Sequence, residues 1–220
     1  MTASQVQHAL SAFAATRSTA TVFLAHNCLK RAIRQAEARD LVRRNVAELV
    51  STPTGKGKGR PSRSLTLVQA TALMAVAEDT TMNAYTVIAL TTGIRTEEAR
   101  ELRWDHVDLT GDPDADPPVP PHVAVWRSVR AGGDTKTPKS RRTLRLPEIA
   151  VDALFAHRAR QSGERIAAGD RWHDTGLVFT SKVGTALDSA NVKRDFRAAC
   201  KTAGIGEDWT PRELRHFVSA

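Results

Sequence analysis

The residues best suited to chemistry in this sequence are basic, and three of them lie close together near its end. Arg212, Arg215 and His216 are spaced so that they share one side of a helix. Two guanidiniums and an imidazole at this spacing repel one another unless an anion lies among them, and the positive end of a helix adds to the same field. We therefore predict an anion pocket, with phosphate as the expected ligand. The alternative is a solvated basic face.

Two further basic residues lie where the chain can direct them into a cleft. Arg95 follows the glycine that ends an apolar helix, and Thr96 reads as the N-cap of a helix over 97–104, whose first two residues are acids. Lys136 lies at the tip of a predicted hairpin, where a lysine can reach a substrate and donate a proton. The alternatives are a surface arginine and a lysine that contacts solvent or a DNA backbone.

The remaining reactive side chains form no catalytic or metal-binding pattern. Cys28 and Cys200 lie far apart without metal-ligand spacing, so zinc is not expected and a reducing cytosol fits. Ser140 has no evident base partner, and the acids of segment 110–121 lie among prolines, which favours a solvated loop over a metal site. We expect no metal, nucleotide or other cofactor.

Positive charge is concentrated in the first third of the chain. The 220 residues carry a net charge of +8, and residues 1–64 hold 11 lysines and arginines against 3 acids, whereas residues 65–220 hold 21 of each. Residues 127–145 add seven basic residues and one acid. A basic arm and a basic hairpin suit a polyphosphate such as DNA, because neutralised phosphates release counterions. An ordinary basic protein is the alternative.

The elements that must position these residues fall into two groups. Helical periodicity predicts a helix over 20–39 and a shorter helical stretch over 40–50. Segment 51–64 is rich in Gly, Pro, Ser and Lys and reads as a flexible basic linker. We therefore predict a partial helical domain at 1–50, a linker at 51–64 and a larger domain at 65–220.

The larger domain is predicted to be mainly α with a small antiparallel β-sheet. Alternating apolar residues predict strands at 122–129 and 141–147, joined into a hairpin, and a further short strand at 177–180. Capping patterns at Thr66, Gly93 and Thr210 mark helix ends. Helices are predicted, in chain order, at 66–78, 82–92, 97–104, 148–161, 188–203 and from 210 onward.

Three segments, in this order, resemble the catalytic boxes of tyrosine recombinases and phage integrases. TTGIRTEEARELRWDHVDL (91–109) is similar to the first arginine box. TKTPKSRRTLRLP (135–147) resembles the β2–β3 hairpin with its catalytic lysine, and TPRELRHFVSA (210–220) resembles the second box. The ordered set covers 65–220, and residues 20–50 resemble the closing helices of the family's core-binding domain. The implied fold is a tyrosine-recombinase catalytic core preceded by a partial core-binding domain.

The resemblance implies DNA strand exchange through a 3′-phosphotyrosyl link, without metal or nucleotide. The two arginines that stabilise the phosphorane fall on Arg95 and Arg215, and the acid for the leaving oxygen falls on Lys136. Arg212 stands where most relatives carry histidine; it can hold a phosphate oxygen but cannot act as a base near neutral pH. The residues expected to contact DNA are Arg127, Arg130, Lys139, Arg141, Arg142 and His216.

The family's nucleophilic tyrosine has no counterpart in these residues. Relatives place it beyond position 220, and the one tyrosine here, Tyr85, lies in an apolar helix, where a core role is expected. We therefore expect an incomplete recombinase, inactive unless a fuller protomer supplies a tyrosine in trans. The alternatives are a non-catalytic DNA-binding protein that antagonises a full-length recombinase, and a basic interaction domain with no role on DNA. An incomplete domain would leave apolar surface uncovered around Leu214, Phe217 and Val218.

The expected partner is double-stranded DNA at attachment or recombination sites, on which copies of the chain could assemble. The sequence has no run of 18 apolar residues, and its first twenty residues lack the pattern of a secretory signal. We therefore expect no membrane partner and a cytoplasmic, nucleoid-associated protein.

Overall fold

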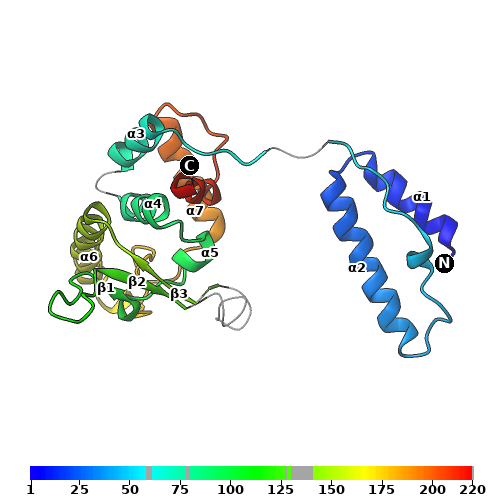
Figure 1. Cartoon of the computed structure of the whole chain (residues 1–220), viewed down its shortest axis with the longest axis horizontal. Helices are drawn as coiled ribbons and strands as arrows, with labels where there is room; N and C mark the ends of the chain where they lie inside the picture. Colours follow the sequence, from blue (N-terminus) through cyan, green and yellow to red (C-terminus); the bar gives the residue numbers. More distant parts are fainter. Residues whose placement is uncertain (58–60, 78–79, 127, 130–140, 220) are drawn as a thin grey trace. The chain divides into compact units, whose positions relative to one another are not determined.

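The computed structural model describes residues 1–57, 61–77, 80–126, 128–129 and 141–219. The chain divides into two compact units, Met1–Ser62 and Arg63–Ala220 (Figure 1). No helix in the described part of the chain is both long and apolar enough to span a bilayer.

The first unit consists of two long helices and a short third one. α1 (Ala3–Ala14) and α2 (Thr19–Glu37) lie side by side, and η1 (Val46–Leu49) packs against both (Figure 1). The predicted helix at 20–39 is confirmed as α2, whereas α1 was not predicted. The unit has its own small apolar core, formed by Val6, Leu10, Ala14, Val22, Ile33 and Ala47.

A buried histidine fastens the returning chain to α2. The Nε2 atom of His26 lies 2.8 Å from the carbonyl oxygen of Ala47, and its Nδ1 atom lies 2.7 Å from the hydroxyl of Thr52. His26 is 1% exposed, so these bonds replace those it would make to water. The end of the first unit is therefore held by a side chain from its central helix.

The second unit is mainly helical and carries a small antiparallel sheet, as predicted. Val123 pairs with Val107 on one side and with Leu144 on the other. The strands, in sheet order, are β1 (Val107–Asp108), β2 (His122–Val125) and β3 (Arg142–Arg145). The helices, in chain order, are α3 (Leu67–Ala77), α4 (Thr81–Thr92), α5 (Thr96–Ala99), η2 (Trp104–His106), α6 (Glu148–Ala168), η4 (Gly169–Arg171), α7 (Ser189–Thr202) and η5 (Pro211–Ser219).

The central element of the second unit is α4. Eight of its 12 residues are buried, and it packs against α3, α6, α7 and η5. A helix that is apolar on all sides is stable only when surrounded in this way. It ends, as predicted, at Gly93, whose φ of 64° is a left-handed conformation that glycine adopts without strain. The end of α4 is therefore fixed two residues before Arg95.

The segment predicted as a strand at 177–180 is not a continuous strand. Within the described part of the chain, it pairs at the isolated bridges Arg103–Leu177 and Thr180–Ala186. The reason is that α6 occupies two of its carbonyl oxygens: the Gln161 side-chain amide donates to those of Leu177 (3.1 Å) and Val178 (3.0 Å). The Gln161 side chain thus makes hydrogen bonds that a neighbouring strand would make in a sheet.

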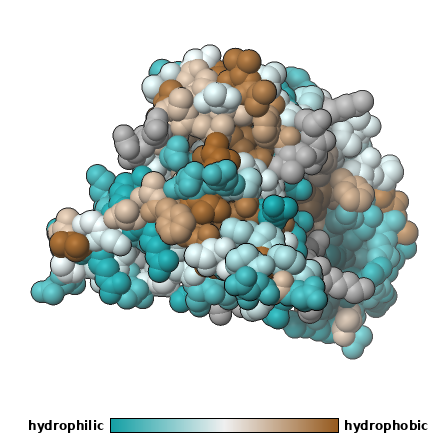
Figure 2. Space-filling model, turned by 60° about the vertical axis from the view of Figure 1, so that its left-hand side comes forward, coloured by the Kyte–Doolittle hydropathy of each residue, from teal (hydrophilic) through white to brown (hydrophobic). Residues whose placement is uncertain are grey.

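One side of the second unit carries an apolar groove between α3, α4 and α6, with a volume of about 650 Å³. Figure 2 shows apolar surface at the top of this view, over α3, where Leu67 and Val68 are largely exposed. Ile149 and Phe155 of α6 are also about half exposed. These exposed side chains lie outside the closed core of the unit.

His157 of α6 is buried in its neutral form by two partners of fixed polarity. Its Nε2 atom lies 2.6 Å from the carbonyl oxygen of Val178, which can only accept, so Nε2 carries the proton. The Arg160 guanidinium, which can only donate, lies 2.6 Å from Nδ1. Burial, reinforced by the positive charge of Arg160, lowers the pKa of His157 to about 4.

We predict that this histidine makes the second unit acid-sensitive. The pKa of His157 is near 6.5 in the unfolded chain and about 4 in the folded one. The folded state is therefore at full stability above pH 6.5, and it loses stability as the pH falls toward 4. The expected loss between pH 7 and pH 5 is about 2 kcal/mol, measurable by urea unfolding at the two pH values. His157→Gln should lose this pH dependence, and His173→Gln, at an exposed position, should keep it. Identical pH dependence in His157→Gln and the native chain would contradict the assignment.

Candidate functional site

Arg95 is held at the start of α5 by a carboxylate one turn further on. It is itself the N-cap residue, so the prediction that Thr96 caps this helix was wrong; Thr96 is the first helical residue. The main-chain N–H of Arg95 donates to Oε2 of Glu98 (2.9 Å), and its Nη1 atom donates to Oε1 (2.7 Å). Its side chain is nevertheless 46% exposed. Glu98 therefore fixes both the backbone and the guanidinium of Arg95 while leaving part of the cation accessible.

The same carboxylate binds a second arginine, which comes from β3. Nη1 and Nη2 of Arg142 donate to Oε1 and Oε2 of Glu98 over 3.0 and 2.9 Å. This bidentate arrangement is the strongest geometry available to a guanidinium and a carboxylate. Arg142 was predicted to contact DNA; in this structure its guanidinium joins the base of the hairpin to α5.

The charge of Glu98 is set by these partners. Glu98 is only 4% exposed. Burial by itself raises the pKa of a carboxyl group, but the hydrogen bonds from Arg142 and from the main chain and side chain of Arg95 outweigh it, so the pKa of Glu98 is lowered. One buried negative charge thus faces two positive ones. The pairing of Glu98 with an arginine was not predicted, although its position three residues after Arg95 was an available signal.

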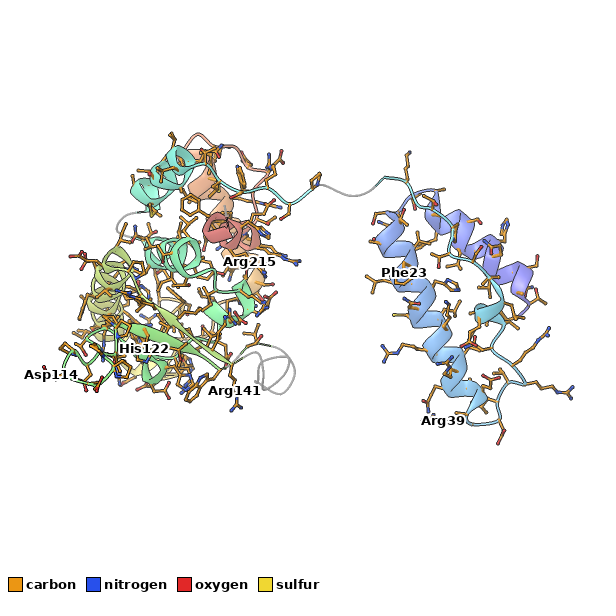
Figure 3. The ribbon with its side chains drawn as sticks, viewed as in Figure 1. Phe23, Arg39, Asp114, His122, Arg141 and Arg215 are labelled. Carbon is orange, nitrogen blue, oxygen red and sulfur yellow. The ribbon has the colours of Figure 1, made fainter. Side chains whose placement is uncertain are left out.

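The second basic group lies on η5, which packs against α4 (Figure 3, which labels Arg215). The predicted helix start is confirmed, but the element is a 3₁₀-helix rather than an α-helix. Residues three apart eclipse in this geometry, so Arg212 and Arg215 lie along one edge. Arg212 is exposed and Arg215 is half-buried. Neither side chain forms a hydrogen bond or ion pair with any residue that the structure describes, which leaves both cations available to an anion.

The apolar residues of η5 do not all face outward. Leu214 was expected to be uncovered, but it is 0% exposed and belongs to the core. Phe217 is half-buried and packs against the same core. The prediction was wrong for Leu214 because η5 turns that side chain into the core while its arginines lie on another edge. The side chain of Val218 lies outside the described residues.

The other predicted site residues are placed as follows. Arg141 is exposed at the start of β3 (Figure 3), and the His216 side chain is half-buried. Four hairpin residues lie outside the described residues: Arg127, Arg130, Lys136 and Lys139. Among the residues that the structure does describe, no group of His, Cys, Asp and Glu is placed to hold a metal ion.

The single tyrosine is a core residue, as predicted. Tyr85 lies in α4, is 1% exposed, and its ring packs edge-on against Phe179 with 5.3 Å between centroids. Burial raises the pKa of Tyr85 to about 12. Cys200 is likewise buried, and burial raises the pKa of its thiol to about 11. Neither group is an accessible, ionised nucleophile.

Known proteins are similar to this chain in sequence. A family model described as "Phage integrase family" matches residues 63–220. An integrase from Streptomyces ambofaciens is 58% identical over 222 residues, which cover 100% of this chain and 57% of the relative. A tyrosine recombinase XerC-like protein from Caldanaerobacter subterraneus is 25% identical over 142 residues, which cover 56% of this chain and 34% of the relative.

Solved structures agree at the level of the fold. A lambda integrase dimer bound to a COC′ core site has a TM-score of 0.67 at 18% identity, covering 100% of this chain and 56% of that one. A Tn1549 transposon integrase in complex with transposon right end DNA has a TM-score of 0.69 at 17% identity, covering 92% and 66%. The chain thus spans about half to two thirds of these structures.

We predict that Glu98→Gln destabilises the second unit, because a neutral amide cannot balance two guanidiniums and leaves at least one donor facing another donor. The expected loss is about 2–4 kcal/mol in the free energy of unfolding, measured with urea at pH 7. Glu97→Gln removes the same charge from the neighbouring position and should cost only a few tenths of a kcal/mol. A loss for Glu98→Gln no larger than that of the control would show that the carboxylate is not needed.

Proposed function

This chain belongs to the phage integrase family, and from that premise we propose that its second unit holds a phosphate of duplex DNA between Arg95 and Arg215. The proposed activity is site-specific DNA breaking and rejoining through a phosphotyrosyl intermediate. The observation that carries the proposal is the pair Arg212 and Arg215, three residues apart on η5 and without a protein partner among the described residues. Like charges near one another repel, and an anion held by both removes that repulsion.

The proposed role of the arginines is to stabilise charge that develops at phosphorus. A phosphorane carries more negative charge on its non-bridging oxygens than the starting diester, so donors already in place bind it more strongly. Arg95 suits this role because Glu98 holds it while its side chain stays 46% exposed. A guanidinium also keeps its charge at any physiological pH.

Two other residues complete the proposed chemistry. Arg212 holds a phosphate oxygen at a position where a base would be expected, and it takes no proton. Lys136 donates a proton to the leaving 5′-oxygen, which would otherwise depart as an alkoxide. Both roles follow from the family's boxes and from charge.

The covalent step needs a tyrosine that residues 1–220 do not offer, since Tyr85 is buried and its pKa is about 12. We propose that the nucleophile comes from further polypeptide or from a second protein. The same observation favours one other function: a chain that binds recombination sites without cleaving them and so antagonises a full-length recombinase.

The proposed partner is double-stranded DNA in the nucleoid, with assembly of several copies on it. The related lambda integrase structures support this, since they hold a dimer on a core site and a tetramer on a Holliday junction. The exposed Arg141 would contribute a phosphate contact outside the pocket.

We predict that DNA binding by residues 1–220 is strongly salt-dependent and that each pocket arginine contributes to it. The measurement is fluorescence anisotropy on a mixed-sequence duplex of roughly 30 base pairs, long enough for several phosphate contacts. Arg95→Ala or Arg215→Ala should each reduce the slope of log K against log salt by about one. Arg165→Ala is the matched control, because Asp174 already neutralises that guanidinium over 3.0 Å. Native slopes in both pocket variants would refute the phosphate contact.

We also predict the outcome of covalent trapping on a nicked suicide duplex that carries a recombination site. Residues 1–220 alone should give no protein–DNA adduct, and adduct should appear when a tyrosine-bearing segment of a full-length relative is added. Arg95→Ala or Arg215→Ala should lower the rate of adduct formation by about 10²–10³-fold. If the added segment gives no adduct and excess chain inhibits recombination by the full-length relative, the antagonist function is correct instead.

A further inference from the structure

The first residue of the second unit is bound to the turn that leads into η5. The main-chain N–H of Arg63 donates to Oε1 of Glu213 over 3.2 Å. Its guanidinium donates to the carbonyl oxygen of Asp208 over 3.3 Å and lies over the Trp209 ring, 4.3 Å from the centroid. Three kinds of contact therefore hold Arg63 against the segment that carries the second pair of arginines.

The next residue makes a further link to the same element. The hydroxyl of Ser64 donates to the main-chain carbonyl oxygen of His216 over 3.2 Å. Residues 63–64 thus contact η5 at two points, Glu213 and His216, which lie on either side of Arg215. Residues 150 and 152 positions apart in sequence are joined here.

Glu213 is the centre of these contacts, and each of its two oxygens serves a different segment. Oε1 accepts from Arg63, whereas Oε2 accepts from the main-chain N–H (2.9 Å) and the hydroxyl (3.0 Å) of Thr210. The residue is 4% exposed, although it lies between Arg212 and Leu214 on a surface element. A carboxylate is buried only when donors compensate for lost water, and these donors do so.

The geometry of η5 depends on such outside support. It is a 3₁₀-helix of nine residues, and runs longer than three or four are uncommon because the hydrogen bonds of a 3₁₀-helix are poorly aligned. Loss of the contacts at its start would let the element relax toward another helical geometry. Arg215, which follows Glu213 along the element, would then leave the position that the 3₁₀ geometry gives it.

We propose that Glu213 is a positioning residue for Arg215, and that the docking of residues 63–64 onto Glu213 and His216 is what sets the geometry of the phosphate pocket. This inference rests on the proposed function, because it concerns the phosphate pocket proposed there. Glu213 does not touch DNA; it acts through η5. Segment 63–64 is accordingly a part of the site, although it lies far from both arginine boxes in sequence.

The variant Glu213→Gln is informative because two roles of Glu213 predict opposite changes in DNA binding. One role is its negative charge, and the other is its positioning of Arg215. Removing a negative charge beside Arg212 and Arg215 strengthens the attraction for DNA if charge alone matters. A glutamine has one acceptor oxygen, so it cannot receive Arg63 and Thr210 together, and weaker binding follows if position matters.

The experiment measures the dissociation constant and its salt dependence for residues 1–220 on the same mixed-sequence duplex. We expect Glu213→Gln to weaken binding about tenfold and to lower the salt slope by about one, as Arg215→Ala does. The double variant should bind no more weakly than Arg215→Ala, because the glutamate acts only through that arginine. Glu207→Gln removes the same charge from an exposed site nearby, paired with Lys201, and should leave binding unchanged or slightly tighter.

The outcomes separate this inference from the function on which it rests. Native binding by Arg215→Ala would refute the pocket itself. Weakened binding by Arg215→Ala together with native or tighter binding by Glu213→Gln would overturn the positioning role, and so would additive losses in the double variant.

A second variant keeps the test decisive if Glu213→Gln does not fold, which its thermal unfolding curve would reveal. Thr210→Val removes only the hydroxyl donor to Oε2 and should weaken binding about threefold, in the same direction. Thr210→Ser keeps the hydroxyl and should restore native binding. Equal binding by Thr210→Val, Thr210→Ser and the native chain would overturn the inference.

Discussion

The carboxylate of Glu98 accepts hydrogen bonds from the main chain and guanidinium of Arg95 and from both terminal nitrogens of Arg142, and the basic face of the second unit depends on it. Two guanidiniums at this distance would otherwise repel each other and turn toward water. A buried carboxylate would likewise be unstable without them. The carboxylate and the two guanidiniums therefore stabilise one another in these positions. They join α5 to β3 by charge as well as by packing.

Glu213 repeats this arrangement at the second basic segment. Both glutamates lie three residues after the N-cap of a short helix, where an acid ordinarily bonds only to the cap. Here each one also takes a donor from a distant segment: Arg142 of β3 in one case and Arg63 in the other. Each of these two glutamates thus caps its helix and also binds a segment far away in the sequence. Since α5 follows α4 and η5 packs against it, both arginine-bearing elements are built on one buried helix.

Features set by neighbouring residues were predictable from the sequence. The caps at Thr66, Gly93 and Thr210 were placed correctly because each rests on a glycine conformation or on hydrogen bonds spanning three residues. The helices α2, α4 and α7 and the hairpin strands followed from periodicity. Within the site, residue type and spacing singled out the arginines of both boxes, and their roles stay predictions.

Features set by distant contacts were not predictable. The contact of Arg142 with Glu98 was missed because the two residues lie 44 positions apart and no local pattern pairs them. Leu214 was expected at the surface because the sequence does not say which edge of η5 meets α4. The two-residue strand β1 is too short to show alternation, and Arg63 looked like one more basic residue of a linker.

The apolar segment at 177–180 has the composition of a strand that other chains could extend by pairing with it. Its backbone is instead already occupied: Gln161 and His157 bind the carbonyl oxygens of Leu177 and Val178, and the N–H of Val178 donates to Leu102. Edge strands with free hydrogen-bonding groups are templates for aggregation, and proteins commonly cover them with charge or with another element. Here a glutamine and a histidine of α6 do so with their side chains. These two buried side chains thereby take the hydrogen bonds that a neighbouring strand would otherwise make, so the apolar segment is completed from within its own unit.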